Sequence, residues 1–457
     1  MTVVVVGTGA ARYTAWHMKM LGIDIGSSSV KAAVLLNGKV RGAVVRAEFE
    51  TRHVGVRVEV DADGVLRAVT KAIGQIGGEA KRVEVVGLSV MSPSWVAMDK
   101  EGKALTPIIT HQDRRSVEEA KAIEARVGKA RFLKLAGNRP VPGGISATTW
   151  AWYRKNEPGR VKRADLVGHL NTFIHRQMTG ERVVDPSNAS FMGVYLTTTQ
   201  GGWSEELCEA VGLPMALLPE VMPSNRIGGK ATAQGARRFG VTCGTPVLAG
   251  IVDTSSAMLL SGAKEGQFTN NCGSTDVLGL CLDRALPHER LLTRALGVGK
   301  KWMSVSTIAA AGTGLEWTRA QLFADLTHDA FWKLVNRLSR EGKRSERHRE
   351  EMMGGVRFEP YLAGERTSVE QRKAAFSGLT LSTNREQMLA AVIEALASAS
   401  AARVELFGEL GVKMLRRVMV TGGAKGGLAE LFHRDWKGKW GFWEEKEATL
   451  RGLGKLA

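Results

Sequence analysis

Hydrophobic residues near the start of the chain form short runs that are interrupted by small and polar residues. The run over 20–25 contains a single acid, Asp24, and the small residues 26–29 follow it. A second apolar run covers 30–36, and a third begins after Asn37-Gly38. Asn-Gly between two alternating runs is a strong hairpin signal. We therefore predict that the loop after Asp24 joins two antiparallel strands, unlike a dinucleotide-binding glycine loop, which must lead into a helix.

Helices and strands alternate in the next part of the chain. Amphipathic spacing predicts a helix over 61–76, and the Val-rich segment 83–91 predicts a strand. Clusters of Gly, Pro and Asn separate the further helices that we predict. These helices cover 116–127, 148–155, 166–178 and 204–211.

The second half begins the same scheme again. We predict a strand at 246–250, a small-residue helix over 253–261, and a strand pair, 267–272 and 277–282, around Gly273-Ser274-Thr275. Helices over 314–323, 329–340 and 385–410 follow, then a strand at 417–421 and a helix that opens at Gly422. This is a repeat of architecture and not of sequence. We place a domain boundary near residue 244, which gives domains 20–244 and 245–457, and interpret 1–19 as an N-terminal extension outside the core.

Size and composition agree with this division. A chain of 457 residues is too long for one ordinary core, so two domains are expected. The sequence has no apolar run long enough to cross a membrane, and we expect no membrane partner. Its four cysteines are far apart and form no CxxC pair, which disfavours a zinc site or a disulfide scaffold. A reduced, cytoplasmic setting is therefore expected.

The net charge of +17 raises the question of a nucleic-acid partner. The basic residues are scattered among acids, and the densest stretch, 343–349, also contains Glu346. Such a stretch is typical of a solvated helix or loop, so we expect no nucleic-acid partner. A positive field would instead attract ATP and sugar phosphates toward a cleft.

The loop after Asp24 has the chemistry of a phosphate site. Small residues let backbone N–H groups approach a phosphate closely, and Ser27 and Ser28 are the candidates. A carboxylate at the end of a strand can hold Mg²⁺, directly or through water. An ordinary strand–turn–strand unit with an acid near its turn is the alternative.

Several motifs occur together in the order of one family, the FGGY carbohydrate kinases, and the resemblance covers nearly the whole chain from Met20. The matching segments are 21–31 (phosphate loop), 111–115 (W-x-D-x-R), 249–253 (A-G-x-x-D), 272–275 (G-T-S), 311–317 (A-G…W), 358–367 (F-x-P-Y-L-x-G-E-R), 421–425 (adenosine motif) and 447–452 (E-x-x-x-x-G). The resemblance implies an α/β fold, the two-domain actin-like ATPase fold (ribonuclease H-like), with an interdomain cleft. It also implies ATP and Mg²⁺ as cofactors.

The resemblance assigns roles to individual residues. Asp253 would be the general base, since a carboxylate that accepts the hydroxyl proton eases phosphoryl transfer. Asp24 would be the second catalytic acid and the magnesium-side ligand. The predicted ATP-binding residues are Ser27, Ser28, Gly273, Ser274, Thr275, Gly312, Gly422, Gly423, Ala424 and Lys425. The predicted substrate-binding residues are Met91, Ser92, Asp113, Asp253 and Thr254.

Each assignment has a purely structural alternative. Asp253 would serve equally as a helix N-cap. The segments 273–275 and 422–423 would be a plain hairpin turn and a packing glycine pair, and the stem of Lys425 either covers the adenine base or only reaches solvent. Arg114 or Arg115 would orient Asp113 or form surface ion pairs. Glu365-Arg366 would support the interdomain region structurally.

Departures from the family pattern bear on the substrate. Xylulokinases carry Q-M-H where this chain has Val90-Met91-Ser92, and the R-E-T-like stretch of glycerol kinases is also missing. We predict ATP-dependent phosphorylation of a sugar hydroxyl, with a ketose such as xylulose as the first candidate. The alternatives are kinases for ribulose, sedoheptulose, gluconate or glycerol, and a non-catalytic sugar or nucleotide sensor on the same scaffold. The substrate is a small molecule in each case, and a homodimer is left open.

Overall fold

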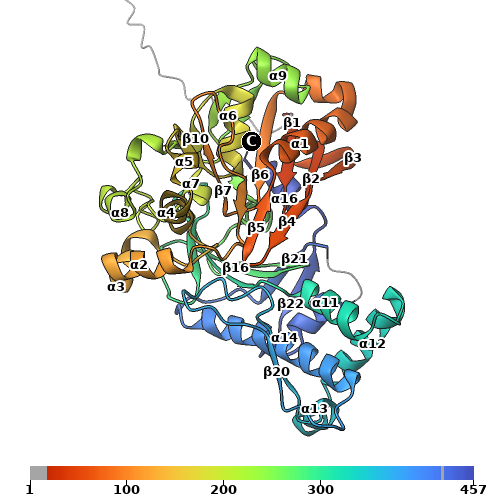
Figure 1. The fold of residues 1–457 in the computed structure, drawn as a ribbon. Coiled ribbons are helices and arrows are strands. Elements are labelled where there is room, and N and C mark those ends of the chain that lie inside the picture. The colour runs from red at the N-terminus through yellow and green to blue at the C-terminus, as the bar shows by residue number, and fades with distance from the viewer. Residues whose placement is uncertain (1–17, 424–426, 457) are drawn as a thin grey trace, which may run out of the picture.

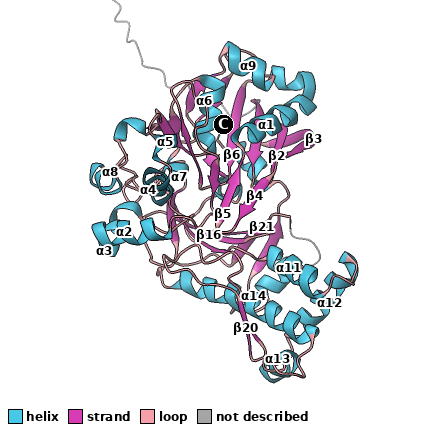
Figure 2. Ribbon diagram, viewed as in Figure 1, coloured by secondary structure: helices cyan, strands magenta, loops and turns pink. Residues whose placement is uncertain are grey.

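The computed structural model describes residues 18–423 and 427–456, which form two large β-sheets with helices outside them (Figures 1 and 2). The first sheet has the strand order β12-β13-β6-β1-β2-β3, and β14 also pairs with β6. Its strands are β1 (Lys19–Ile25), β2 (Ser29–Leu36), β3 (Lys39–Glu48), β6 (Val85–Val90), β12 (Ile227–Lys230), β13 (Pro246–Leu248) and β14 (Ile251–Val252). The antiparallel pair β1–β2, with Asp24 opposite Lys31, confirms the predicted hairpin.

Helix α1 (Ala62–Ile76) covers one face of the first sheet, as its periodicity predicts. Its apolar stripe, which includes Val65, Val69 and Ile73, is buried in the same core as β1 and β6. Asp61 caps the helix by accepting the Gly64 N–H at 2.8 Å. The other helices of this half are η1 (Gly77–Arg82), α6 (Leu170–Thr179) and α9 (Ala233–Phe239).

A five-stranded sheet that we did not predict lies beside the first one, in the order β4-β5-β8-β7-β9. Its strands are β4 (Thr51–Val54), β5 (Arg57–Val60), β7 (Ser94–Met98), β8 (Ile108–Thr110) and β9 (Leu166–Gly168). The prediction of one helix over 166–178 is therefore wrong in its first turn, because Leu166–Gly168 pairs with β7 before α6 begins.

Short helices and a small strand pair complete the first half. They are α2 (Val117–Val127), α3 (Lys129–Ala136), α4 (Ser146–Asn156), α5 (Pro158–Val161), β10 (Val183–Val184), α7 (Pro186–Ala189), α8 (Glu205–Val211), η2 (Met215–Leu217) and β11 (Glu220–Val221). Trp95 of β7 stacks on Tyr153 of α4, with ring centroids 5.3 Å apart, and so ties these helices to the five-stranded sheet.

The second large sheet has the order β17-β18-β16-β15-β21-β22. Its strands are β15 (Phe268–Cys272), β16 (Asp276–Leu282), β17 (Leu292–Ala295), β18 (Trp302–Ile308), β21 (Arg417–Thr421) and β22 (Gly441–Glu444). The antiparallel β15–β16 pair confirms the second predicted hairpin.

Helices cover the outer face of this sheet, with the long α14 (Arg385–Gly408) at its centre (Figure 1). The others are α11 (Gly312–Leu322), α12 (His328–Glu341), α13 (Glu346–Met353) and α15 (Leu428–His433), and β19 (Arg357–Glu359) pairs with β20 (Ala375–Ser377). The helix predicted to open at Gly422 begins only at Leu428. Among the helices of the described residues, none combines the length and apolarity that crossing a membrane would need.

Two helices connect the halves. α10 (Asp253–Leu260) follows β14 directly, and α16 (Ala448–Leu453) packs against α10 and against β1 of the first sheet. The Ser256 hydroxyl donates to the Thr449 carbonyl at 2.6 Å. The boundary near residue 244 stays a prediction, although β13 and β14, which follow it, hydrogen-bond within the first sheet. Residues 1–17 of the expected extension lie outside the described residues, and Lys19 is already part of β1.

Candidate active site

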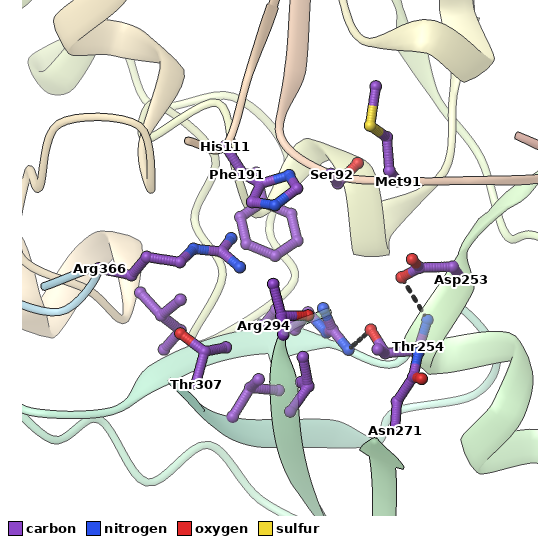
Figure 3. A pocket seen from close by; sticks show the side chains of 14 residues that line it. Met91, Ser92, His111, Phe191, Asp253, Thr254, Asn271, Arg294, Thr307 and Arg366 are labelled. Carbon is purple, nitrogen blue, oxygen red and sulfur yellow. Dashed lines mark hydrogen bonds between the residues drawn. The ribbon is translucent and has the colours of Figure 1, made fainter. Parts of the chain in front are cut away.

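A small pocket lies where the two halves meet, with a cavity volume of about 70 Å³ (Figure 3). That volume is room for roughly five ordered water molecules. The first half contributes Met91, Ser92, His111 and Phe191, and the start of α10 contributes Asp253 and Thr254. The second half contributes the polar residues Asn271, Thr275, Arg294, Thr307 and Arg366, together with the apolar residues Val277, Leu292 and Val305.

Asp253 is the acid of this pocket. It is the first residue of α10, and its Oδ1 accepts the Thr254 N–H at 2.5 Å. The N-cap position belongs to Val252, so the capping alternative for Asp253 does not hold. Burial raises the pKa of the Asp253 carboxyl, and the nearby Arg294 guanidinium acts in the opposite direction. Asp253 therefore lines the cavity while one of its carboxylate oxygens accepts the N–H of the next residue of α10.

A buried network that we did not predict positions the backbone before Asp253. The Ser187 hydroxyl accepts the Val252 N–H at 3.0 Å, and Asp185 accepts the Ser187 N–H at 2.9 Å. Asp185 also accepts side-chain bonds from Asn188 at 2.6 Å and Asn171 at 2.9 Å. Burial raises the pKa of Asp185 to about 6. The signal in the sequence was Asp-Pro at 185–186, which is typical of a helix start.

Asp24 lies on β1 of the first sheet, and Asp253 directly follows β14 of the same sheet. Asp24 of β1 and Ile251 of β14 both pair with Ser89, on opposite sides of β6. Asp24 and Ile251 are therefore two strand spacings apart, about 10 Å. Oδ2 of Asp24 accepts the Thr449 hydroxyl at 2.7 Å, whereas its buried Oδ1 has no hydrogen-bond partner among the described residues. Burial, together with the charge of Asp253, raises the pKa of Asp24 to about 6.

The predicted nucleotide-binding segments converge at the edge of the second sheet. The N–H groups of Ala311 and Gly312 donate to the carbonyls of Ser274 (3.0 Å) and Gly273 (3.1 Å). A Cβ on Gly312 would lie 2.6 Å from the Gly273 carbonyl oxygen. A Cβ on Gly422, whose φ is +111°, would lie 2.3 Å from the Cys272 carbonyl oxygen. These contacts require glycine and leave a backbone surface without side chains.

The remaining nucleotide-site predictions have three different outcomes. Ser27 and Ser28 are exposed in the β1–β2 turn, and Ser274 is exposed in the β15–β16 turn. Gly423 lies beside Gly273, with its nitrogen 3.6 Å from the position that a Gly273 Cβ would take. Ala424 and Lys425 lie outside the described residues.

The residues present fit a magnesium–triphosphate group. Within 18–423 and 427–456 no three acids, histidines or cysteines form a metal-binding cluster. Mg²⁺ is usually held by one or two carboxylates together with substrate phosphates and water, rather than by an all-protein cage. The unpartnered Oδ1 of Asp24 suits that arrangement, as do the two small-residue turns.

The structure brings four of the five predicted substrate residues into the pocket and leaves one out. Met91, Ser92, Asp253 and Thr254 line it, but Asp113 does not. The Asp113 carboxylate instead accepts the Val58 N–H at 2.7 Å and the Arg115 guanidinium at 2.7 Å. The predicted substrate contact of Asp113 is therefore corrected to a structural ion pair. Arg115 orients Asp113, which was one of the two predicted roles for the neighbouring arginines. The ion pair that these residues form is buried, so it is not the surface ion pair of the other alternative.

Two arginines of the pocket were not predicted. Arg366 was assigned to interdomain support, yet its side chain lines the cavity. The motif at 358–367 contains Arg366, but the sequence does not indicate that the side chain of Arg366 is directed into a pocket. Arg294 lies in the middle of β17, in the sequence Leu-Thr-Arg-Ala, and a lone cation in a short strand carries no signal of a site.

Comparisons with known proteins agree with this architecture. Residues 19–260 match the N-terminal domain of the FGGY family of carbohydrate kinases, and 268–425 match the C-terminal domain. Xylulose kinase of Escherichia coli (strain K12) is 26% identical over 425 residues, which cover 89% of this chain and 82% of the relative. Gluconokinase of Bacillus subtilis (strain 168) is 26% identical over 387 residues, 82% of this chain and 74% of the relative.

A solved structure gives the same fold. The crystal structure of xylulose kinase from Rhodospirillum rubrum has a TM-score of 0.79 at 22% identity, covering 95% of this chain and 88% of that one. This likeness confirms the two-domain actin-like ATPase fold. Because the N-terminal family match alone spans more than half of its residues, the chain belongs to the FGGY family of carbohydrate kinases and is an enzyme of that family.

Proposed function

We propose that this kinase transfers the terminal phosphoryl group of ATP to a hydroxyl of a small polyhydroxylated acceptor, and that Asp253 accepts the hydroxyl proton. One observation carries the proposal. Asp253 shares its pocket with Asn271 and Thr275, beside the predicted phosphate turn, and with Met91 and Ser92 of the first half. An acceptor in this pocket would lie between the base and the phosphate turn.

The surroundings of Asp253 suit a general base. Burial raises its pKa, which makes the carboxylate a better proton acceptor. The guanidinium of Arg294 favours the ionised form, so the group stays ready to accept a proton near neutral pH. The bond between Ser187 and Val252 holds the backbone before Asp253 in place. Positioning of this kind supplies much of the catalysis in phosphoryl transfer.

The nucleotide would bind along the second sheet. The backbone around Gly273, Ser274 and Gly312 would cradle its phosphates, and Gly422 and Gly423 leave room beside them. Asp24 would hold Mg²⁺, which would neutralise charge on the phosphates and orient them. FGGY kinases use ATP as phosphate donor, and the unpartnered oxygen of Asp24 supports the magnesium assignment.

The acceptor is the open part of the proposal. A ketose such as xylulose was our first expectation, and the xylulose kinases among the relatives support it. Gluconokinases are about equally similar, so sequence similarity alone does not choose between a sugar and a sugar acid.

Asp253→Asn tests the base. We expect kcat to fall by at least about 100-fold, because general-base catalysis contributes that much or more. ADP binding, measured by calorimetry, should stay within a factor of about two, since the predicted nucleotide contacts lie elsewhere. ADP release would be followed over a panel of ketoses, aldonates and polyols.

The matched control is Asp63→Asn, which removes an exposed acid of α1 and should change nothing. Wild-type turnover in Asp253→Asn would overturn the assignment of the base. If the wild type phosphorylates none of the acceptors but still binds sugar and nucleotide, the sensor alternative is favoured instead.

A further inference from the structure

Two buried arginines face the pocket, and neither forms an ion pair with another of the described residues, although Asp253 lies near enough for its charge to act on both. Arg294 of β17 is 3% exposed, and Arg366, in the segment between β19 and β20, is 7% exposed. Both line the cavity; Figure 3 shows the guanidinium of Arg366 directed into it and that of Arg294 directed toward the Thr254 hydroxyl. Long basic side chains are almost never buried to this degree unless they are paired.

Neither guanidinium finds acceptors for all of its donors among the described residues. Arg294 donates to the Thr254 hydroxyl and to the Met303 sulfur at 3.5 Å, but its Nε has no acceptor. The Nε of Arg366 is also buried without an acceptor. No carboxylate of the described residues lies within 4.0 Å of either guanidinium, since neither forms an ion pair.

Other buried arginines of the chain behave differently. Arg115 lies 2.7 Å from Asp113, Arg434 lies 2.6 Å from Glu394, and Arg403 is paired with Asp276. Arg114 is an exception, since it is buried and forms no ion pair among the described residues, but its Nη1 donates to the carbonyls of His111, Asp113 and Pro142. Arg294 and Arg366 differ from all four in that they line a cavity where a substrate would bind.

The local charge is unfavourable without a bound anion. Burial lowers the pKa of Arg366 to about 9; the charges of Arg114 and Arg294 act in the same direction, and that of Asp253 acts against them. Burial lowers the pKa of Arg294 to about 10, although Asp253 and Asp185 act against it. His111 lies beside them, and burial with the charges of Arg366 and Arg114 holds its pKa well below the usual value. An anion between the two guanidinium groups would relieve this repulsion.

We propose that Arg294 and Arg366 bind a carboxylate of the acceptor, so that the substrate of this kinase is a polyhydroxylated acid rather than a neutral ketose. This inference rests on the proposed function. A planar carboxylate matches the donor geometry of guanidinium groups. Figure 3 shows Arg366 and Asp253 on opposite sides of the cavity. A substrate between them would present its carboxylate at one end and a hydroxyl at the other.

The position of the pair favours the acceptor over ATP as the source of the anion. Arg294 lies 5.5 Å over the ring of Phe191, and both arginines share the cavity with His111, on the first-half side. Gly312 and Gly422, the glycines of the nucleotide surface, do not line this cavity. A sugar phosphate would offer similar chemistry, so the experiment must separate it from a carboxylate.

Matched acceptors provide the first test. D-Gluconate and D-glucitol differ in one end group, a carboxylate against a CH₂OH, and D-xylonate and xylitol form a second pair. We expect kcat/KM to be at least about 30-fold higher for each acid, since hydrogen bonds to a charged group contribute about 1.5–3 kcal/mol, or roughly 10- to 150-fold. D-Xylulose and D-ribose 5-phosphate complete the panel.

Variants provide the second test. Arg294→Met should lower kcat/KM for the acids at least about 30-fold more than for the alcohols, while KM for ATP stays constant. Loss of its charge beside Asp253 affects both classes of acceptor, whereas loss of the carboxylate contact affects only the acids. Arg294→Lys keeps the charge and should recover part of the loss. The control is Arg347→Met, which removes a guanidinium that is 90% exposed.

Folding is checked on the same variants. Arg294→Met removes a buried charge whose desolvation outweighs the attraction of Asp253 and Asp185, so its melting temperature without ligand should equal or exceed that of the wild type. The wild type should melt at a higher temperature when gluconate is added, and the variant should not.

The outcomes are distinct. Equal use of acids and alcohols, or a faster reaction with xylulose, overturns the carboxylate site but leaves the kinase intact. Preference for ribose 5-phosphate assigns the arginines to a phosphate ester and overturns the proposal. A changed KM for ATP in Arg294→Met assigns them to the nucleotide. If no acceptor is phosphorylated, the proposed function fails, and calorimetry with gluconate on wild type and Arg294→Met still decides whether the anion site exists.

Discussion

The two oxygens of the Asp24 carboxyl have different environments. One accepts a hydrogen bond from Thr449, and the other is buried without a partner among the described residues. Burial disfavours the charged form, and the charge of Asp253 disfavours it further, although Lys31 partly offsets both. A bound cation favours the ionised carboxylate, so we expect binding of magnesium–nucleotide to lower the pKa of Asp24 again.

The raised pKa of Asp24 predicts a pH dependence of stability. In the folded protein this carboxyl keeps a proton up to about pH 6, whereas its ordinary pKa is 3.8. Between about pH 4 and pH 6 the folded state therefore binds more protons than the unfolded chain, and the free energy of unfolding falls as pH rises. The loss from this group is about 3 kcal/mol, at about 1.4 kcal/mol for each pH unit, and it is complete above pH 6.

Asp24→Asn should remove this contribution while keeping an acceptor for Thr449. Urea unfolding at pH 4 and pH 7 should show the variant more stable than the wild type at pH 7 by about 1–3 kcal/mol, with little difference at pH 4. Asp63→Asn serves again as the exposed control. Parallel stability curves for the wild type and Asp24→Asn would contradict the raised pKa.

At the residue scale, sequence reasoning found groups that carry a motif and missed groups that act through burial. Asp253, Met91 and Ser92 reach the pocket because each follows a strand end within a recognisable pattern. Asp113 was misassigned because a carboxylate looks the same in sequence whether it faces a substrate or Arg115. Arg294 carried no signal, because the absence of a partner is a property of three-dimensional packing alone.

At the scale of elements, the contact between α10 and α16 links both acids to one piece of structure. Asp253 begins α10, and Thr449 of α16 binds Asp24. Gly452 is the point of closest approach, since a Cβ there would lie 1.9 Å from the carbonyl oxygen of Ser256. Backbone at that distance cannot yield without moving one helix away from the other.

Gly452→Ala should therefore destabilise the protein and impair catalysis together. We expect a loss of about 1–3 kcal/mol in the free energy of unfolding, as for overpacked sites, and a fall in kcat greater than the change in KM for ATP. Gly74→Ala is a matched control inside helix α1, where an added Cβ meets nothing within 4 Å. That control should be stabilised by up to about 1 kcal/mol. Equal effects of the two substitutions on urea unfolding would contradict the role of the contact.

Elements with a strong periodicity of hydrophobic residues were predictable from the sequence, and short strands buried on both faces were not. The two hairpins, α1 and α14 follow directly from alternation or helical spacing over many residues. Strands β7, β8 and β9 are three to five residues long and buried throughout, so no alternation marks them. Runs of that length do not distinguish a strand from a buried helical turn. The five-stranded sheet beside the pocket was missed for this reason.

At the scale of the whole molecule, the repeated hairpin-and-helix scheme was visible in sequence because each half contains its own turn of small residues. The exact division was not visible, because the chain returns to the first sheet with β13 and β14 before it builds the second. That return places Asp253 at the end of a strand of the sheet that carries Asp24, and also at the edge of the second half. The proposed catalytic pair therefore depends on the order in which strands join the sheet, which local patterns do not encode.

The charge of the whole molecule gives a last prediction about the nucleotide. A net charge of +17 at pH 7 creates a field that attracts ATP toward the protein, and salt screens such a field. Raising NaCl from about 50 to 500 mM shortens the Debye length from roughly 14 Å to about 4 Å. We expect KM for ATP to rise several-fold over this range, with kcat nearly constant, in initial-rate assays with excess acceptor.

KM for a neutral acceptor such as xylitol is the internal control and should not change. Constant KM for ATP would show that only local contacts draw the nucleotide. Salt-sensitive retention of the protein on duplex DNA would instead revive the nucleic-acid alternative, which our interpretation of scattered charge excludes.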